Sequence, residues 1–190
     1  PSNWDLPFIA NKIFQRLLSC AGSILQLASK QNLSVELLDV LIVFAKGNCS
    51  VEFLHCDVGD YLWLKLLPPK ELLQSNYSLN AAQHREWTVQ MWWPIYARGI
   101  ELVTILYQKH SNHFLRDTLQ FVGIHEEYLI DSLLLGKQSL ESLAMNLIKS
   151  AVTLIASLVS SEKQWRLEHS QSLFSLMVNI YFLIRHITRA

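Results

Sequence analysis

Apolar residues return every three or four positions along most of this chain, and no segment alternates with a period of two for long enough to form a strand. The first spacing places side chains on one face of a helix, whereas alternation is needed for a half-buried strand. Glycine, which weakens helix interiors, is also scarce, with 6 among 190 residues. The pattern predicts an all-α fold in which helices alternate with short turns.

The clearest single helix is expected over Leu140–Val159. Its apolar residues share one stripe, formed by Leu140, Leu143, Leu147, Ala151, Leu154 and Leu158. Polar residues share the opposite face, namely Glu141, Asn146, Lys149, Thr153 and Ser157. After this helix, Ser161–Gln164 fits a capping box, and Leu173–Ile187 predicts a last helix that is apolar on two sides.

The first half of the chain predicts three helical segments, of which the first is long. The first begins after Asp5, with a core stripe at Ile13, Leu17, Cys20, Ile24 and Ala28. Ser34 is the expected cap of the second helix, which ends at Lys46-Gly47 because glycine commonly follows a helix. A third segment, Val51–Leu67, is closed by two prolines that cannot continue a helix.

A long helix is expected from Pro94 to about His110, since proline is well tolerated in the first turn. Ser75–Gln83, just before this region, is the least patterned stretch and the best candidate for a long loop. A length of 190 residues suits one domain with a real core, so residues 1–190 are expected to form a single helical domain with a break at 75–83 at most.

Composition argues against several classes of function. Net charge is zero and no basic stripe exists to neutralise phosphates, so nucleic acid is not the expected partner. The longest charge-free runs near the C-terminus are shorter than the about 18–20 apolar residues needed to span a membrane. Charged residues make up only 17%, below the typical share of about 25%, which suggests surfaces that are covered in a larger molecule. The start at Pro1-Ser2, without methionine, also favours a fragment.

Few residues could carry chemistry. His110, His113 and His125 could in principle hold zinc, but their place at a helix end favours solvated side chains. Cys20, Cys49 and Cys56 lack the spacing of a metal site and are expected to be reduced, packed thiols. No phosphate loop, nucleophile elbow or metalloprotease motif occurs, so we expect no enzyme and no cofactor.

The stretch Asn112–Leu135 carries a distinctive motif and reads as two short amphipathic helices that meet at Gly123. Asn112 is the expected N-cap of the first, and Gly123 is expected at the position after its C-terminus with a positive φ. Helix pairs of this kind, stacked in series, form an α-solenoid. No strict repeat appears, so the expected form is an irregular HEAT-like or armadillo-like solenoid of stacked antiparallel helices, with a compact bundle as the alternative.

This motif resembles the C-terminal region of the large scaffold nucleoporins of the nuclear pore's inner ring. The residues that carry the resemblance are Phe114, Leu115, Leu119, Phe121, Val122, Gly123, His125 and Glu127. The likeness covers Trp92–Ile187, whereas the first ninety residues carry no motif of the family. The resemblance implies a structural scaffold at the nuclear envelope that supports nucleocytoplasmic transport. It also implies other nucleoporins as partners, in particular a helical segment of a linker nucleoporin, with Phe-Gly repeats as a further class of ligand.

Trp87, Trp92 and Trp93 cluster with Tyr96 around Pro94. Aromatic residues at such a bend either fill the gap between diverging helices or form a groove for an amphipathic helix. We expect Trp87 and Trp93 to lie in the core, and Trp92 and Tyr96 to bind a partner. A helical interaction adaptor unrelated to the pore would share every feature except the motif, and remains the alternative function.

Overall fold

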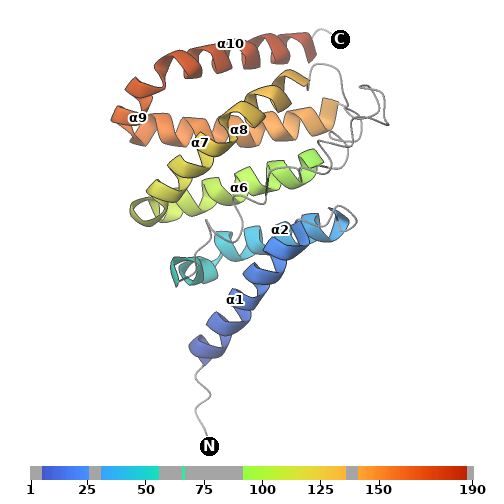
Figure 1. Cartoon of the computed structure of the whole chain (residues 1–190), viewed down its shortest axis with the longest axis vertical. Coiled ribbons are helices and arrows are strands. Elements are labelled where there is room, and N and C mark those ends of the chain that lie inside the picture. Colours follow the sequence, from blue (N-terminus) through green and yellow to red (C-terminus); the bar gives the residue numbers. More distant parts are fainter. Residues whose placement is uncertain (1–5, 26–30, 56–65, 67–91, 136–140, 188–190) are drawn as a thin grey trace, which may run out of the picture.

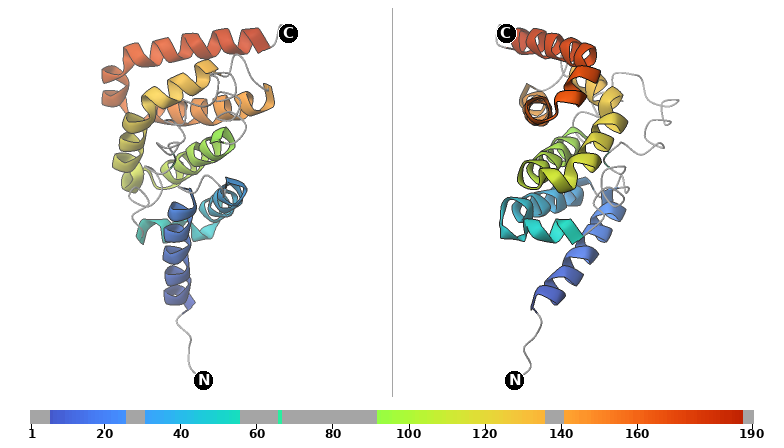
Figure 2. Two further views of the ribbon diagram at one scale, coloured as in Figure 1. Left: turned by 45° about the vertical axis from the view of Figure 1, so that its right-hand side comes forward. Right: turned by 90° about the vertical axis from the view of Figure 1, so that its left-hand side faces the viewer.

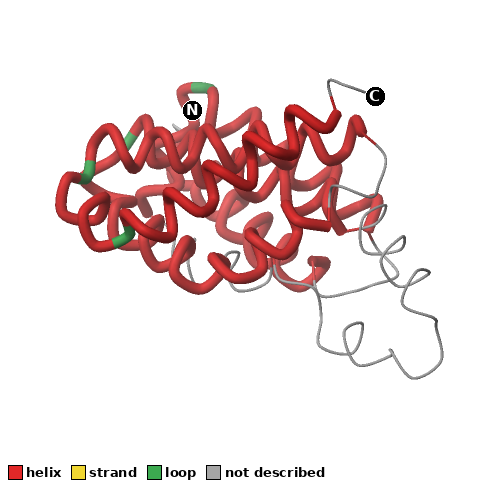
Figure 3. Tube along the Cα trace, turned by 90° about the horizontal axis from the view of Figure 1, so that it is seen from above, coloured by secondary structure: helices red, strands yellow, loops and turns green. Residues whose placement is uncertain are grey.

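The computed structural model describes residues 6–25, 31–55, 66, 92–135 and 141–187. Nearly all of these residues are helical and none of them lies in a strand, which confirms the all-α prediction (Figure 3). The N-terminal part contains helices α1 (Leu6–Leu25) and α2 (Gln31–Lys46) and the 3-10 helix η2 (Asn48–His55). The predicted loop at 75–83 and Trp87 lie outside the described residues.

In the C-terminal part the described residues form five further α-helices: α6 (Trp93–Lys109), α7 (Ser111–Leu135), α8 (Glu141–Ser161), α9 (Lys163–Glu168) and α10 (Ser170–Ile187). Helix α6 packs against α2 on one side and α8 on the other, so the three form a row (Figure 1). All three run in the same direction in this row, while α7 and α10 run back across it. Helices α1 and α7 cover the other side of the row (Figure 2). This arrangement is that of a solenoid fragment.

The central helix α6 explains why the row is stable. Its described side chains are buried on two faces, as the sequence predicted, and Pro94 lies in its first turn as expected. The predicted stripe on α8 is confirmed where its side chains are described, since Leu147, Ala151, Leu154 and Leu158 are buried. Because the helices of the row pack closely, the polar side chains between neighbouring helices are held at fixed positions.

The prediction of two helices meeting at Gly123 was wrong. Helix α7 runs without interruption through Gly123, and no described residue, glycine included, has a positive φ. A glycine inside a helix costs only about 1 kcal/mol relative to alanine, and the three- and four-residue apolar spacing continues on both sides. Asn112 is not the N-cap either. The helix begins at Ser111, and the carbonyl of His110 accepts the amides of His113 and Phe114, each at 3.0 Å.

Several other local predictions need correction. Helix α1 is rotated from the predicted stripe: Phe14 and Leu18 are buried, whereas Ile13 is 63% exposed and Cys20 is exposed. Phe14 sets this rotation because its ring packs edge-to-face on Phe53 at 4.6 Å. Cys49 is exposed as well, so the two described cysteines are free but not packed, while Cys56 lies outside the described residues.

Two predicted helix caps are absent. Helix α2 begins at Gln31, so Ser34 lies one turn inside it and is buried, although the predicted end at Lys46-Gly47 is confirmed. At the start of α9 the N-cap is Glu162, which makes no side-chain cap hydrogen bond. Gln164 donates forward to Glu168 at 2.9 Å, so the predicted capping box does not form.

Candidate docking groove between three helices

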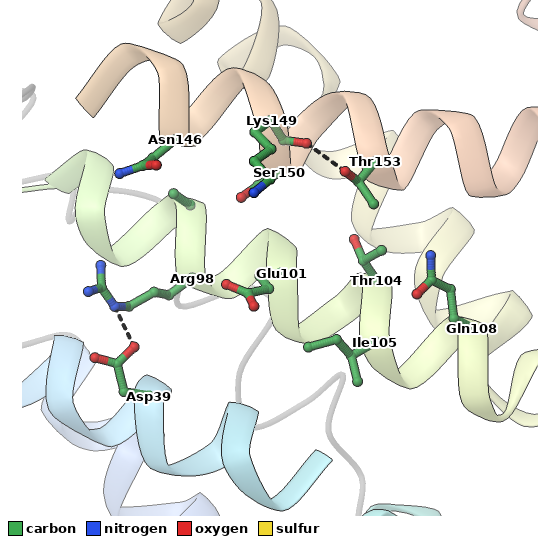
Figure 4. Close-up of a pocket in the computed structure, with 11 residues that line it drawn as sticks. Asp39, Arg98, Glu101, Thr104, Ile105, Gln108, Asn146, Lys149, Ser150 and Thr153 are labelled. Atoms are coloured by element: carbon green, nitrogen blue, oxygen red, sulfur yellow. Dashed lines mark hydrogen bonds and ion pairs between the residues drawn. The ribbon is translucent and has the colours of Figure 1, made fainter. Parts of the chain in front are cut away.

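The row of α2, α6 and α8 carries a polar pocket of about 420 Å³ on its outer surface (Figure 4). We call this pocket the groove. Helix α6 supplies its floor and the neighbouring helices supply its two walls. The lining residues are Asp39 from α2; Ala97, Arg98, Glu101, Thr104, Ile105 and Gln108 from α6; and Asn146, Lys149, Ser150 and Thr153 from α8. The residues from α6 recur at three- and four-residue spacing, so they form a third, polar face beside its two buried faces.

Charged side chains join α2 to α6 along one wall. Arg98 Nε donates to Asp39 Oδ1 at 2.6 Å, and Lys46 Nζ donates to Glu101 Oε1 at 2.8 Å. Asp39 and Lys46 are more than half exposed at the side chain, so each pair contributes at most about 1 kcal/mol to stability. Their main effect is to hold opposite charges in fixed places at the groove's edge.

Hydrogen bonds fix the other wall and the groove's end. Gln108 Nε2 donates to Ser157 Oγ at 2.9 Å, joining α6 to α8. Lys109 Nζ donates to the carbonyls of Lys46 and Gly47, the latter at 3.0 Å, and so satisfies the C-terminal end of α2. These contacts tie the three helices together at one end of the row.

Tyr107 is buried and makes hydrogen bonds at the same end of the row. Its hydroxyl shares a hydrogen bond with Ser161 Oγ and donates to Glu162 Oε1 at 3.0 Å, where α8 turns into α9. Burial raises the pKa of Tyr107 above its usual value of 10.0, the nearby Glu162 carboxylate raises it further, and the Ser161 bond partly opposes this. The tyrosine is therefore neutral at physiological pH and can keep donating to the carboxylate.

Lys149 differs from the other charged residues of the groove. Its side chain is exposed, and its ammonium has no ion-pair or hydrogen-bond partner among the described residues. Ile105 adds apolar surface to the lining (Figure 4), as does Ala97. The groove thus combines one cation available for pairing with fixed dipoles and a small apolar strip, a mixture suited to a polypeptide segment.

The structure does not expose the aromatic residues assigned to partner binding. Trp92 and Tyr96 are each 0% exposed, and Trp93 is 1% exposed. Trp92 Nε1 donates to the carbonyl of Leu66 at 2.8 Å, so its one polar atom is satisfied inside the molecule. The exposure that the partner-binding prediction requires is absent here, and all three described aromatic residues fill the core where the chain enters α6.

The sequence alone did not reveal the groove, for a specific reason. It placed Asn146, Lys149 and Thr153 on the polar face of their helix but could not say which helix faced them. The polar positions of α6, including Arg98 and Glu101, were hidden between two apolar faces. As for the three histidines, the part of the chain that the structure describes contains no group of three potential metal ligands.

A row of parallel helices backed by returning helices defines a helical protein of the α-solenoid type. Among proteins of known identity, the nucleoporin Nup188 of Drosophila melanogaster is 61% identical to this chain over 189 residues. The match covers 98% of the chain but 10% of that protein, so the chain spans about a tenth of the length of this relative. The resemblance to a large nucleoporin is confirmed, and it extends through the first ninety residues, where no motif was recognised.

Comparison with family models finds no match for this chain. No solved structure matches it either. The described helices also contain none long and apolar enough to cross a membrane.

Proposed function

We propose that this chain is a section of a scaffold nucleoporin of the nuclear pore's inner ring, located in the pore at the nuclear envelope. In this role its helical surfaces dock other nucleoporins and so support nucleocytoplasmic transport, without catalysis. The observation that carries the proposal is the 61% identity to a nucleoporin over 98% of the chain. Identity at that level over nearly the whole chain supports a shared role as well as a shared fold.

The polar groove is the docking surface that the described residues support best. Its two ion pairs are already satisfied within the chain. They therefore disfavour any partner that does not bring groups of complementary charge. Lys149 is the exception, and a carboxylate from a docked segment would complete its pairing. We therefore assign the groove to a helical segment of a linker nucleoporin that carries an acidic side chain beside an apolar strip.

Charge reversal at Lys149 tests the groove. Lys149→Glu in the full gene product should reduce recovery of other nucleoporins from nuclear extract at least tenfold, equivalent to about 1.4 kcal/mol. Lys163→Glu is the matched control, because Lys163 is equally charged and exposed but lies on α9, outside the groove. Equal recovery with both variants would reject the groove while leaving the scaffold role intact. Failure of the unmodified protein to recover nucleoporins would reject the scaffold role itself.

A further inference from the structure

The groove is longer along the helices than across them (Figure 4). Its lining comes from residues 97–108 of α6 and 146–153 of α8, and from Asp39 of α2. With a rise of 1.5 Å per residue, the lining on α6 extends about 16 Å along the helix axis. Axes of packed helices lie about 8–10 Å apart, so the groove is about as wide as one helix. A docked helix therefore fits lengthwise, in contact with about three turns of α6.

The unpaired polar groups of the groove gather toward the start of α8. Within the residues that the structure describes, the side chains of Asn146, Lys149 and Ser150 make no hydrogen bond or ion pair. Farther along the groove, the hydroxyls of Thr104 and Thr153 are already used, because each donates at 2.8 Å to the carbonyl four residues earlier in its own helix. A polar side chain from a docked segment thus finds free partners at one end of the groove alone.

Apolar surface lies nearer the other end, at Ile105, and its distance from Lys149 follows from the helix register. Gln108 is hydrogen-bonded to Ser157, so these two residues lie level on α6 and α8. Ile105 comes three residues before Gln108, whereas Lys149 comes eight residues before Ser157. Because α6 and α8 run in the same direction, this difference of five residues places Lys149 about 7 Å nearer the N-terminal ends of the row.

We propose that the segment docked in the groove is a helix of about three turns that lies along α6 and α8 and does not cross the row. Its acidic residue pairs with Lys149, and an apolar residue four or seven positions from that acid contacts Ile105. Residues at these spacings share one face of a helix, whereas residues two positions apart face opposite sides. The inference rests on the proposed function and adds to it the direction of the segment and the spacing of its two anchoring side chains.

Photo-crosslinking in cells tests the direction of the segment. The full gene product is expressed with the photo-reactive residue benzoylphenylalanine in place of Asn146 in one variant and of Gln108 in another. Because Gln108 lies level with Ser157, the two positions are about 16 Å apart along the row. We expect the variants to link to one nucleoporin, at residues about 8–14 positions apart in its sequence. Benzoylphenylalanine in place of Lys163, on α9 outside the groove, is the control and should not link to that segment.

A segment that crosses the row would give a different pattern. Such a helix contacts the groove over about 10 Å, which is the width of one helix. The two variants would then link to residues within about four positions of each other, or one variant alone would form a link. Either pattern would overturn the lengthwise arrangement.

Carbodiimide, which joins an amine to a carboxylate in contact with it, tests the two anchors in the otherwise unmodified protein. We expect Lys149 to become linked to Asp or Glu in the segment found by photo-crosslinking, with an apolar residue four or seven positions away. Replacing that apolar residue by Asp should lower recovery of the nucleoporin at least tenfold, whereas the same change two positions farther along should not. Equal recovery of the two variants would overturn the anchor spacing. If Lys149 forms no link while nucleoporins are still recovered, the groove and this inference both fail and the scaffold role stands.

Discussion

The same substitution, glycine to alanine, should have opposite effects at two positions in neighbouring helices. Gly123 lies inside α7, and a Cβ placed there would meet nothing within 4 Å. Gly99 lies inside α6, and a Cβ there would lie 2.6 Å and 2.7 Å from the two methyl carbons of Leu66. Both are helical glycines, so the gain in helix propensity from alanine is common to both, at about 1 kcal/mol.

At Gly99 that gain is outweighed by overpacking. Leu66 is 0% exposed, and its carbonyl is held by Trp92 Nε1, so the leucine cannot move aside freely. Overpacking of a tight core costs about 1–3 kcal/mol, and the short distances place this case in the upper half of that range. Gly99→Ala is therefore expected to destabilise the chain by about 1–2 kcal/mol, while Gly123→Ala stabilises it by about 1 kcal/mol.

Thermal melting followed by circular dichroism checks both signs. For a chain of this size, 1 kcal/mol corresponds to about 2–4 °C. The melting temperature should rise by about that amount for Gly123→Ala and fall by up to twice as much for Gly99→Ala. In a Leu66→Ala background, Gly99→Ala should become stabilising, because the clash is gone. A fall for Gly123→Ala would restore a helix end at that glycine, and a rise for Gly99→Ala would refute the packing around Leu66.

Three further variants test the core and the contacts between helices. Trp92→Ala should cost about 3–5 kcal/mol in the free energy of unfolding, because the side chain is wholly buried; an unchanged melting curve would restore it as an exposed anchor. Tyr107→Phe should cost about 1 kcal/mol at about pH 8. Because the pKa of Tyr107 is raised in the folded state, its contribution is complete below about pH 10 and is lost as the pH rises through the folded value. Urea unfolding should therefore show the gap between the unmodified protein and Tyr107→Phe closing above that pH, and a gap that widens would contradict this sign. Lys109→Met should cost about 0.5–1 kcal/mol, because it removes the cation at the C-terminal end of α2; Lys163→Met, on exposed surface, should leave urea unfolding unchanged.

The sequence was a good guide to which segments are helices and a poor guide to which face of each helix is buried. The stripe on α8 and the start of α6 within one residue of Pro94 were predictable, because each depends on residues within one helix. The rotation of α1 was not, because it is set by Phe14 packing on a distant aromatic residue, Phe53. Gly123 misled for a related reason: a glycine that ends a helix and one on its solvent face look alike in sequence.

The candidate sites show the same division. A cluster rich in tryptophan is compatible with a core or with an interface, and only the structure shows that Trp92, Trp93 and Tyr96 are buried. Arg98 and Lys149 line one surface only because three helices lie side by side, and the sequence does not show that arrangement. Family resemblance, by contrast, depended on a short motif and was recognisable before any packing was known.

Location in the cell tests the central claim most directly. A fluorescent tag on the full gene product, expressed from its own locus, should give a punctate nuclear rim that coincides with a marker of the nuclear pore. The account predicts that the tagged protein stays at the rim after detergent removes the nuclear membranes, as a scaffold component held by other nucleoporins would. A diffuse distribution in the cytoplasm with no rim would contradict the scaffold role and favour a helical adaptor that is unrelated to the pore.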